Sequence, residues 1–468
     1  MQPGNRRSPL GASILFTGVL AGCLDAPAGP ALRPVPTVDS AIVAANPHNV
    51  LSAIVSIHVR GADSVAVRLE PPTDDSVTAS VSVTADVALV PVLGLRPAQR
   101  YVLRALAYGA GGTTLGDPFE WTTGALPADL PRYTAGGTDP SPGYIVFAAG
   151  MYGVVIDNAG RIVWYRRFPT GVGLNFSAQP NGRYVARPPT PAVGDIEPWV
   201  ELDQLGTVTR TLACDGGLQP RLHDLIAEPS GSYWIMCDES RTMDLSSASG
   251  VPAARVTGTV VQRVGADGAL LFQWSPFDHF AITDVELAER SAANVNWTHG
   301  NAIDLDTDGN LLVSFRNLNE ITKIDTRSGA VIWRLGGLRN QFTFLDTPTP
   351  AFAHQHGVRF LGGGALAILD NVGNPSESRA ERYVLDEAAR TARLAHSYGS
   401  SPGVVTQIGG SVQPLEGGRT LVSFGTEGRV EEYDAQGRLT WSIQGNAGYV
   451  FRAQRIRSLY APGVGTAR

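Results

Sequence analysis

Residues 325–333 read DTRSGAVIW, a tight turn followed by a short apolar strand that ends in tryptophan. Asp, Ser and Gly favour turns, whereas β-branched and aromatic residues favour strands. The same unit recurs as DNAGRIVW (157–164), DGALLFQW (267–274) and DAQGRLTW (434–441), with weaker copies DQLGTVTR (203–210) and DEAARTARL (386–394). A unit that recurs in this way predicts a fold built from repeated supersecondary elements.

A second unit alternates with the first and consists of a glycine turn followed by an apolar strand. Its copies are NGRYVA (181–186), SGSYWI (230–235), DGNLLV (308–313), GGGALAIL (362–369) and GGRTLV (417–422). Two alternating turn signals in about 40–55 residues are typical of a propeller blade of four antiparallel strands. The six tryptophan-type units predict an all-β, six-bladed β-propeller over residues 138–468. Five or seven blades remain open, because residues 245–295 are irregular.

Residues 38–130 show a different pattern, with six or seven short runs of alternating apolar and polar residues, such as SAIVSIHVRG. Alternation over short, evenly spaced runs predicts a small β-sandwich in front of the propeller. The stretch LGLRPAQRYVLRALAY resembles domains of the fibronectin type III and immunoglobulin-like kind. This resemblance implies a corner formed by Leu95, Pro97 and Tyr101.

The N-terminal residues predict export. Arg6 and Arg7 precede an apolar run from about Leu10 to Leu20, which is typical of a secretory signal and too short to span a bilayer. No other long apolar run follows in the chain. We therefore expect an exported protein whose mature part has no membrane-spanning helix.

The motif LAGC at 20–23 resembles the bacterial lipobox. It implies a lipoprotein signal peptide over residues 1–23 and a lipid on Cys23, so the protein is expected at the cell envelope, facing the periplasm or the exterior. The alternative is an ordinary signal peptide that is cut elsewhere. Residues 24–37 are rich in Pro and Ala and predict a tether between the anchor and the fold.

Composition narrows the range of partners and covalent links. The formal net charge of −6 argues against nucleic acid, which requires a basic surface. The two cysteines other than Cys23 are Cys214 and Cys237. An oxidising compartment permits a disulfide between them, but two buried free thiols fit the sequence as well. The sequence makes no prediction of oligomeric state.

Three histidines occupy equivalent positions in successive blades. The innermost strand of a blade lines the central channel and precedes the glycine turn of the second unit. His223, His299 and His356 each come shortly before such a turn. Arg316 lies about as far beyond the turn at 308–309 as His299 lies before it, and an antiparallel hairpin brings such positions to one end. Three imidazoles and one guanidinium are thus predicted to meet at one mouth of the channel.

This combination of side chains favours an anionic ligand. Arginine offers planar donors that match a tetrahedral oxyanion, and a neutral imidazole can act as a nucleophile or as a hydrogen-bond donor. A zinc site made by the three histidines is an alternative, against which the charge of Arg316 argues. A third interpretation is polar lining of a wet channel. We expect neither a metal nor another cofactor.

The stretch AFAHQHGVRF at 351–360 adds a second imidazole, because His354 and His356 are two residues apart. In one strand they would point to the same face. His354 is expected either to support the site or to be polar filling of the channel. The four remaining histidines show no equivalent placement and are expected to be ordinary residues: His48, His58, His279 and His396.

Four stretches together resemble the bacterial aryl-sulfate sulfotransferase family, whose members need no nucleotide sulfate donor. They are LHDLIAEPSGSYWIM (222–236), NWTHGNAIDLDTDGNLLVSFRNLNEITKIDTRSGAVIWRLGG (296–337), FAHQHGVRFLGGGALAILDN (352–371) and YVFRAQRIRSLY (449–460). The unit IDTRSGAVIW also resembles the tryptophan-docking repeats of quinoprotein dehydrogenases, which are structural. We therefore interpret the tryptophan units as architecture.

The resemblance implies a catalytic propeller that moves a sulfuryl group from an aryl sulfate to a phenol by a ping-pong route through a sulfated histidine. The family's Gln-His motif matches Gln355-His356, which makes His356 the nucleophile. Its Trp-Thr-His-x-Asn, Ser-x-Arg-Asn and His-Asp motifs place His299, Arg316 and His223 around the sulfuryl oxygens and the leaving phenolate. Two alternatives remain: a non-catalytic binding propeller of the envelope, and a metal-dependent hydrolase or lyase.

Overall fold

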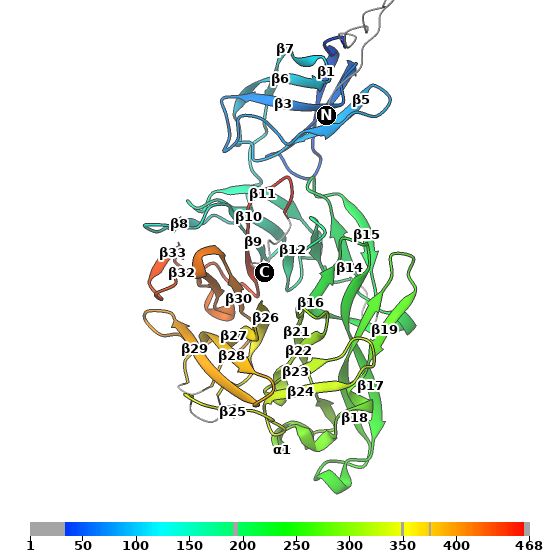
Figure 1. Ribbon diagram of the computed structural model, residues 1–468, viewed down its shortest axis with the longest axis vertical. Helices are drawn as coiled ribbons and strands as arrows, with labels where there is room; N and C mark the ends of the chain where they lie inside the picture. The colour runs from blue at the N-terminus through cyan, green and yellow to red at the C-terminus, as the bar shows by residue number, and fades with distance from the viewer. Residues whose placement is uncertain (1–32, 191–194, 348–350, 374–375, 463–468) are drawn as a thin grey trace, which may run out of the picture.

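The computed structural model describes residues 33–190, 195–347, 351–373 and 376–462. Within these ranges the chain is nearly all-β, and its strands form eight sheets. Two sheets near the N-terminus lie apart from the other six, which are arranged around a common centre (Figure 1). The prediction of an all-β chain is confirmed.

The two N-terminal sheets pack against each other. One has the order β1-β2-β5 and consists of β1 (Thr37–Ala45), β2 (Ala53–Arg60) and β5 (Val87–Val92). The other has the order β4-β3-β6-β7 and consists of β3 (Ser64–Glu70), β4 (Val81–Ser82), β6 (Arg100–Gly109) and β7 (Gly112–Thr122).

Alternation along these strands produces the shared core. Val55 and Ile57 of β2 are fully buried, and so is Leu103 of β6, while the intervening residues are more exposed. Tyr101 accepts a hydrogen bond on its hydroxyl from the backbone N–H of Arg96 at 2.8 Å. A tyrosine that bonds to the backbone a few residues upstream stabilises the corner before the strand, as it does in immunoglobulin-like sandwiches.

The other six sheets follow one another around the centre. In chain order, the first three are built as follows: β9 (Tyr144–Ala149), β10 (Tyr152–Ile156) and β11 (Ile162–Arg167) with β34 (Ala453–Ile456); β12 (Phe176–Ala178), β13 (Tyr184–Ala186), β14 (Trp199–Leu202) and β15 (Val208–Leu212); β16 (Gln219–Ala227), β17 (Tyr233–Met243), β18 (Ala254–Val264) and β19 (Leu270–Trp274), with β20 (Asn294–Asn296) beside β18.

The remaining three sheets complete the set. They are β21 (Gly300–Leu305), β22 (Leu311–Phe315), β23 (Glu320–Ile324) and β24 (Val331–Gly336); β26 (His356–Gly362), β27 (Ala365–Asp370), β28 (Arg379–Asp386) and β29 (Thr391–Gly399), with β25 (Thr343–Phe344) beside β29; and β30 (Ser411–Pro414), β31 (Thr420–Ser423), β32 (Val430–Tyr433) and β33 (Leu439–Gln444), with β8 (Thr134–Gly136) beside β33.

Strands from both ends of this region join the last sheet to the first. The C-terminal strand β34 pairs with β9, and the early strand β8 pairs with β33 (Figure 1). Both pairings are antiparallel, and each joins two segments that are far apart in sequence. The strand β8 lies before residue 138, where the sequence analysis expects this region to begin.

In each of these six sheets, one strand faces the common centre. A single cavity is lined by residues of β12, β16, β21, β26, β30 and β34, which places these six strands around one channel. Each of the first five is followed by a turn and the next strand of its own sheet. The glycine-turn units of the sequence thus mark the turn after an inner strand, as the repeat pattern predicts.

The tryptophans of the repeated unit lie in β11, β19, β24 and β33, each the fourth strand of its sheet counted from the common centre, and are at most 1% exposed: Trp164, Trp274, Trp333 and Trp441. The indole N–H of Trp164 donates to the carbonyl of Gln204 in the next sheet, at 2.8 Å. That of Trp441 donates to Asn158, also in a neighbouring sheet, at 2.9 Å. These residues connect adjacent sheets, which agrees with their interpretation as architecture.

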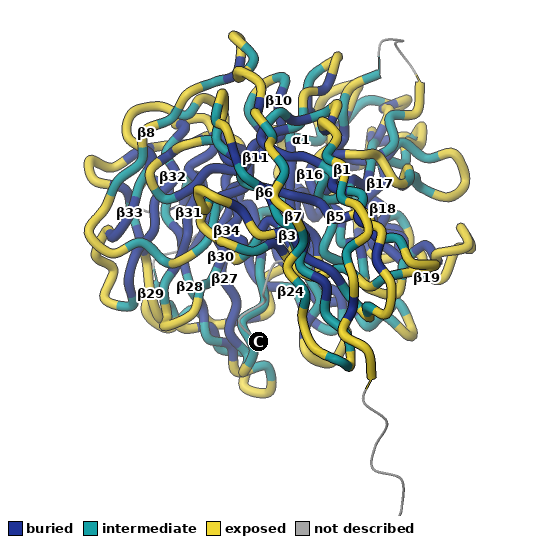
Figure 2. The backbone as a smooth tube through the Cα atoms, turned by 90° about the horizontal axis from the view of Figure 1, so that it is seen from above, coloured by how far each residue is buried: buried dark blue, intermediate teal, exposed yellow. Residues whose placement is uncertain are grey.

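The helical segments are short. They are α1 (Leu287–Arg290) and the 3-10 turns η1 (Asp215–Gly217), η2 (Ser246–Ala248), η3 (Pro276–Asp278), η4 (Ile282–Asp284), η5 (Arg316–Leu318), η6 (Glu416–Gly418) and η7 (Gly425–Glu427). Several of them lie in the irregular stretch 245–295. Figure 2 shows that the strands are mostly buried, whereas the connections are exposed at the rim.

The structure decides between the two states predicted for Cys214 and Cys237, whereas the predicted signal peptide lies outside the described residues. Cys214 and Cys237 form a disulfide with a Cα–Cα distance of 6.2 Å, which ties the segment before β16 to β17. The predicted signal peptide, Cys23 and most of the tether lie outside the described residues. Among the residues that are described, no helix has the length and apolar character needed to cross a membrane.

Candidate active site

His356 is the first residue of the inner strand β26, and it is 2% exposed. Its Nδ1 lies 2.9 Å from the carbonyl oxygen of His354 and 2.8 Å from Asn371 Oδ1. The amide nitrogen of Asn371 donates to the carbonyl oxygens of Thr406 and Gly409, which turns Oδ1 toward the imidazole. Because Nδ1 faces two acceptors, we assign the ring proton to Nδ1. Nε2 therefore carries the lone pair.

The imidazole of His356 is held in its neutral form. Burial lowers the pKa of His356 to about 4, against the hydrogen bond to Asn371, and the positive charge of Arg316 acts in the same direction as burial. The backbone N–H of Gly409 donates to Nε2 at 3.3 Å, as expected for an unprotonated nitrogen. At neutral pH this nitrogen has the protonation state that a nucleophile requires.

The other two histidines of the predicted cluster contact each other. His299 directly precedes β21, and His223 lies where the pairing of β16 with β17 is irregular. Their Nε2 atoms are 3.3 Å apart. Asn296 Nδ2 donates to His299 Nδ1 at 2.6 Å, so the proton of His299 sits on Nε2 and points to His223. The Nδ1 of His223 then carries a proton, is buried and has no hydrogen-bond partner.

Both rings are neutral at neutral pH. Burial, followed by the charges of Arg221 and Arg316, lowers the pKa of His299 to about 2. Burial and Arg221 also hold the pKa of His223 well below its usual value. A buried N–H group without an acceptor is costly, and an oxygen atom of a ligand would satisfy it.

Arg316 is the cation of the cluster. It follows β22 in η5, and its backbone N–H donates to the carbonyl of His299 at 3.0 Å, which confirms that the hairpin brings the two residues to one end. Its Nη2 lies 3.2 Å from His354 Nδ1, and its Nη1 donates to Asn317 Oδ1 at 2.8 Å. Its Nε is buried without a partner. Among the described residues, no carboxylate lies within ion-pair distance of Arg316.

His354 does not share a strand face with His356. Strand β26 begins only at His356, and His354 precedes it with a left-handed backbone, φ 54°. Its backbone N–H donates to Asn319 Oδ1 at 2.8 Å, which fixes this turn. The expectation of two imidazoles on one strand was therefore wrong, because period-two alternation applies only within an extended strand. His354 instead contacts Arg316 through its Nδ1.

Sequence reasoning missed the residues that orient the cluster. Asn371 sets the tautomer of His356, and Asn296 sets that of His299. The ring of Phe451 packs edge-on against His223 and His356, at centroid distances of 5.7 and 6.1 Å. Asparagine at the end of a strand has many ordinary roles, so these residues gave no signal without their three-dimensional neighbours.

The remaining histidines lie elsewhere in the fold. His279 stacks on Trp274 with centroids 5.1 Å apart, and His396 stacks on Tyr398 at 5.9 Å. His58 belongs to β2, and His48 to a turn between β1 and β2. No group of three His, Cys, Asp or Glu side chains in the described part of the chain is arranged to hold a metal ion.

The arrangement combines an unprotonated imidazole nitrogen with unpaired donors and a guanidinium that has no carboxylate at ion-pair distance among the described residues. Such donors stabilise negative charge on oxygen when they are fixed in a site that excludes most water. The cluster can therefore bind a small oxyanion group and attack its central atom from Nε2.

Residues 219–446 match the family described as arylsulfotransferase (ASST). The match supports a place for this region in the arylsulfotransferase family. The match contains His223, His299, Arg316 and His356, and it confirms the family resemblance drawn from the sequence. Membership supports aryl sulfotransferase activity in general.

No curated protein matches the chain. Among solved structures, a protein of unknown function from Bacteroides caccae is similar with a TM-score of 0.44 and 14% identity, over 68% of this chain and 100% of that one. A streptogramin B lyase is similar with a TM-score of 0.38 and 14% identity, over 68% and 85% of the two chains. At this level, neither similarity carries information about the reaction.

Proposed function

We propose that the protein is an aryl-sulfate sulfotransferase that transfers a sulfuryl group from an aryl sulfate to a phenol without a nucleotide donor. The observation that carries the proposal is the state of His356, whose proton is held on Nδ1 while its neutral ring lies in the field of Arg316, a cation with no carboxylate at ion-pair distance among the described residues. The substrates in this proposal are small aryl sulfates and phenols.

In the first half-reaction the lone pair of His356 Nε2 gives up its hydrogen bond from the Gly409 N–H and attacks the sulfur atom. A sulfur–nitrogen bond forms, the bond from sulfur to the aryl oxygen breaks, and the electron pair leaves with the phenolate. Arg316 and His223 donate hydrogen bonds to the sulfuryl oxygens and to the departing oxygen, and His299 joins them when its Nε2–H turns from His223 to the ligand. Phenols have a pKa near 10, so the phenolate is a tolerable leaving group once it is hydrogen-bonded.

In the second half-reaction a phenol replaces the first product. Its oxygen attacks the sulfur of the sulfated His356, the sulfur–nitrogen bond breaks, and the electron pair returns to Nε2. The phenolic proton passes to a neighbouring base or to solvent. The acceptor of the Nδ1 proton, Asn371, supports the positive charge of the intermediate ring without taking the proton.

The finer architecture belongs to the same proposal. We take the six sheets around the channel as the six blades of a propeller, and the two N-terminal sheets as a fibronectin-III/Ig-like domain over residues 38–130. The predicted signal peptide and the lipid on Cys23 would export the enzyme and hold it at the cell envelope. The pairing of Cys214 with Cys237 agrees with an oxidising compartment.

The test is turnover of 4-nitrophenyl sulfate with phenol as acceptor, followed by nitrophenol release. His356→Ala should abolish turnover, because it removes the nucleophile, and His396→Ala should leave it unchanged, because that ring only stacks on Tyr398. Activity should survive EDTA. Equal turnover in wild type and His356→Ala would reject the assigned nucleophile, and loss of activity in EDTA would favour a metal-dependent enzyme.

A further inference from the structure

Phe451 packs against two of the histidines of the candidate site. Its side chain is 2% exposed, and its ring makes edge-on contacts with His223 and His356. The backbone carbonyl of Phe451 accepts a hydrogen bond from Gly410 at 3.0 Å, next to the Gly409 that contacts His356 Nε2. Both the backbone and the ring of Phe451 are therefore held in place.

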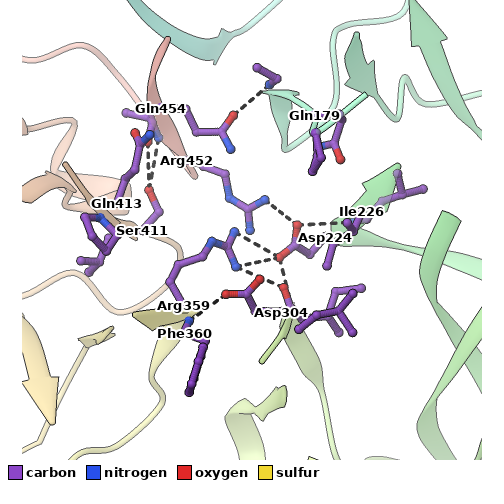
Figure 3. A pocket seen from close by; sticks show the side chains of 18 residues that line it. Gln179, Asp224, Ile226, Asp304, Arg359, Phe360, Ser411, Gln413, Arg452 and Gln454 are labelled. Carbon is purple, nitrogen blue, oxygen red and sulfur yellow. Dashed lines mark hydrogen bonds and ion pairs between the residues drawn. The ribbon is translucent and has the colours of Figure 1, made fainter. Parts of the chain in front are cut away.

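A group of buried charges lies directly behind this ring. Asp224 accepts hydrogen bonds from Arg452 and from Arg359, the latter at 3.4 Å, and from the backbone N–H of Ile303 at 3.2 Å (Figure 3). The guanidinium carbon of Arg452 is 5.8 Å from the centroid of the Phe451 ring. We call Asp224, Arg359 and Arg452 the Arg–Asp cluster.

The Arg–Asp cluster connects three inner strands. Asp224 belongs to β16, Arg359 belongs to β26, and Arg452 directly precedes β34. Asp224 follows His223 in sequence, and Arg452 follows Phe451. Each contact within the cluster thus also fixes a neighbour that touches the candidate active site.

Beyond the Arg–Asp cluster the channel contains a cavity of about 130 Å³. More of its wall is apolar than polar, but the wall includes the amides of Gln179, Gln413 and Gln454 and the charged groups of the Arg–Asp cluster; neither Phe451 nor any histidine lines it (Figure 3). A water molecule occupies about 30 Å³ in the liquid, and amide and charged groups in a cavity of this size can hold water. Asp224 and Arg452 line the cavity, and they directly follow His223 and Phe451 in the sequence.

Water behind the site would compete with the acceptor. In hydrolysis a water oxygen attacks the sulfur of sulfated His356, the sulfur–nitrogen bond breaks, and its electron pair returns to Nε2. The water loses its protons to solvent, and sulfate is released. A transferase must therefore keep water away from the sulfur while a phenol is absent.

We propose that Phe451, held in place by the Arg–Asp cluster, closes the back of the active site and makes the enzyme a transferase rather than a sulfatase. This inference rests on the proposed function. Phe451 is a specificity-determining residue, because its ring contacts both His356 and Arg452, and Arg452 lines the cavity. Asp224, Arg359 and Arg452 are positioning residues, because they act on the reaction only through Phe451 and His223.

The experiment measures how the sulfuryl group is divided between water and phenol. Enzyme is supplied with 4-nitrophenyl sulfate and a fixed concentration of phenol, and inorganic sulfate and phenyl sulfate are quantified together. Phe451→Ala should raise the ratio of sulfate to phenyl sulfate about tenfold, since it opens the back of the site to water. Phe451→Leu, which keeps part of the volume, should raise it by a smaller factor.

The matched control is Phe360→Ala, which changes another aromatic residue on the far side of the cavity and should leave the ratio at the wild-type value. A wild-type ratio in both Phe451 variants would overturn the inference. If Phe451→Ala does not fold, an unchanged ratio in Phe451→Leu alone overturns it. Wild-type enzyme that forms no sulfated histidine would instead reject the proposed function itself.

Discussion

The two ends of the channel differ in how the charge of an arginine is paired. At the inner end, beside the cavity, Arg452 forms an ion pair with Asp224. At the histidine end, Arg316 contacts only neutral partners, His354 and Asn317. Burial lowers the pKa of both arginines, so both side chains are kept in an unfavourable environment.

This difference separates structure from function. A buried charge that is paired and hydrogen-bonded can serve the fold. A half-buried charge that lacks a carboxylate lowers stability, and such groups collect at functional sites. The same contrast holds for the imidazole N–H of His223, which is buried and unpaired one residue before the fully bonded Asp224.

The largest effect should come from removing the matching charge at the inner end. Asp224→Ala removes the carboxylate that both Arg452 and Arg359 contact, which should lower the free energy of unfolding by about 3–5 kcal/mol. Chemical denaturation of the full chain measures the loss. Asp39→Ala is the control, since its exposed ion pair with Arg60 should contribute little. Equal free energies of unfolding for the two variants would show that Asp224 does not stabilise the fold through its arginine partners.

A change at the histidine end should act on the reaction instead. Arg316→Met keeps the length of the side chain and removes the charge, so turnover of 4-nitrophenyl sulfate should fall about 10²–10³-fold. The midpoint of unfolding should stay the same or rise, because no carboxylate loses its partner. Steady-state rates and a denaturation curve on the same preparation make the comparison. A variant that is destabilised but fully active would reverse the assignment of the two ends.

The smallest effect concerns pH. The lone pair of His356 is lost only when the pH falls through its pKa of about 4, so the rate should be nearly equal at pH 7.5 and pH 5.5. A histidine with an ordinary pKa of about 6.5 would leave about a tenth of the rate at pH 5.5. Initial rates in one buffer series of constant ionic strength distinguish the two. A pH–rate profile with a midpoint near 6.5 would show that burial does not govern the pKa of His356.

Much of the fold was readable from the sequence, because its signals are local. Turn residues followed by β-branched strands and tryptophan act within one unit, and Trp164 and Trp441 are buried where the repeat predicts. The equivalent positions of His223, His299 and His356 could be derived from the same repeat. The prediction for His354 failed because its left-handed turn depends on Asn319, which belongs to the preceding sheet.

The groups that tune the site were not readable in advance. Asn371 matters because its amide is bound to the carbonyls of Thr406 and Gly409, which come from a loop far along the chain. Phe451 matters because three inner strands bring it between a histidine pair and the Arg–Asp cluster. Such long-range contacts leave no periodicity in the sequence.

The most direct test of the account is the mass of the protein after brief exposure to 4-nitrophenyl sulfate in the absence of a phenol, followed by peptide mapping at neutral or alkaline pH. The account predicts one added SO3 group, located on the peptide that contains His356, and its loss when phenol is added. No added group, or a group on another histidine while turnover continues, would contradict it.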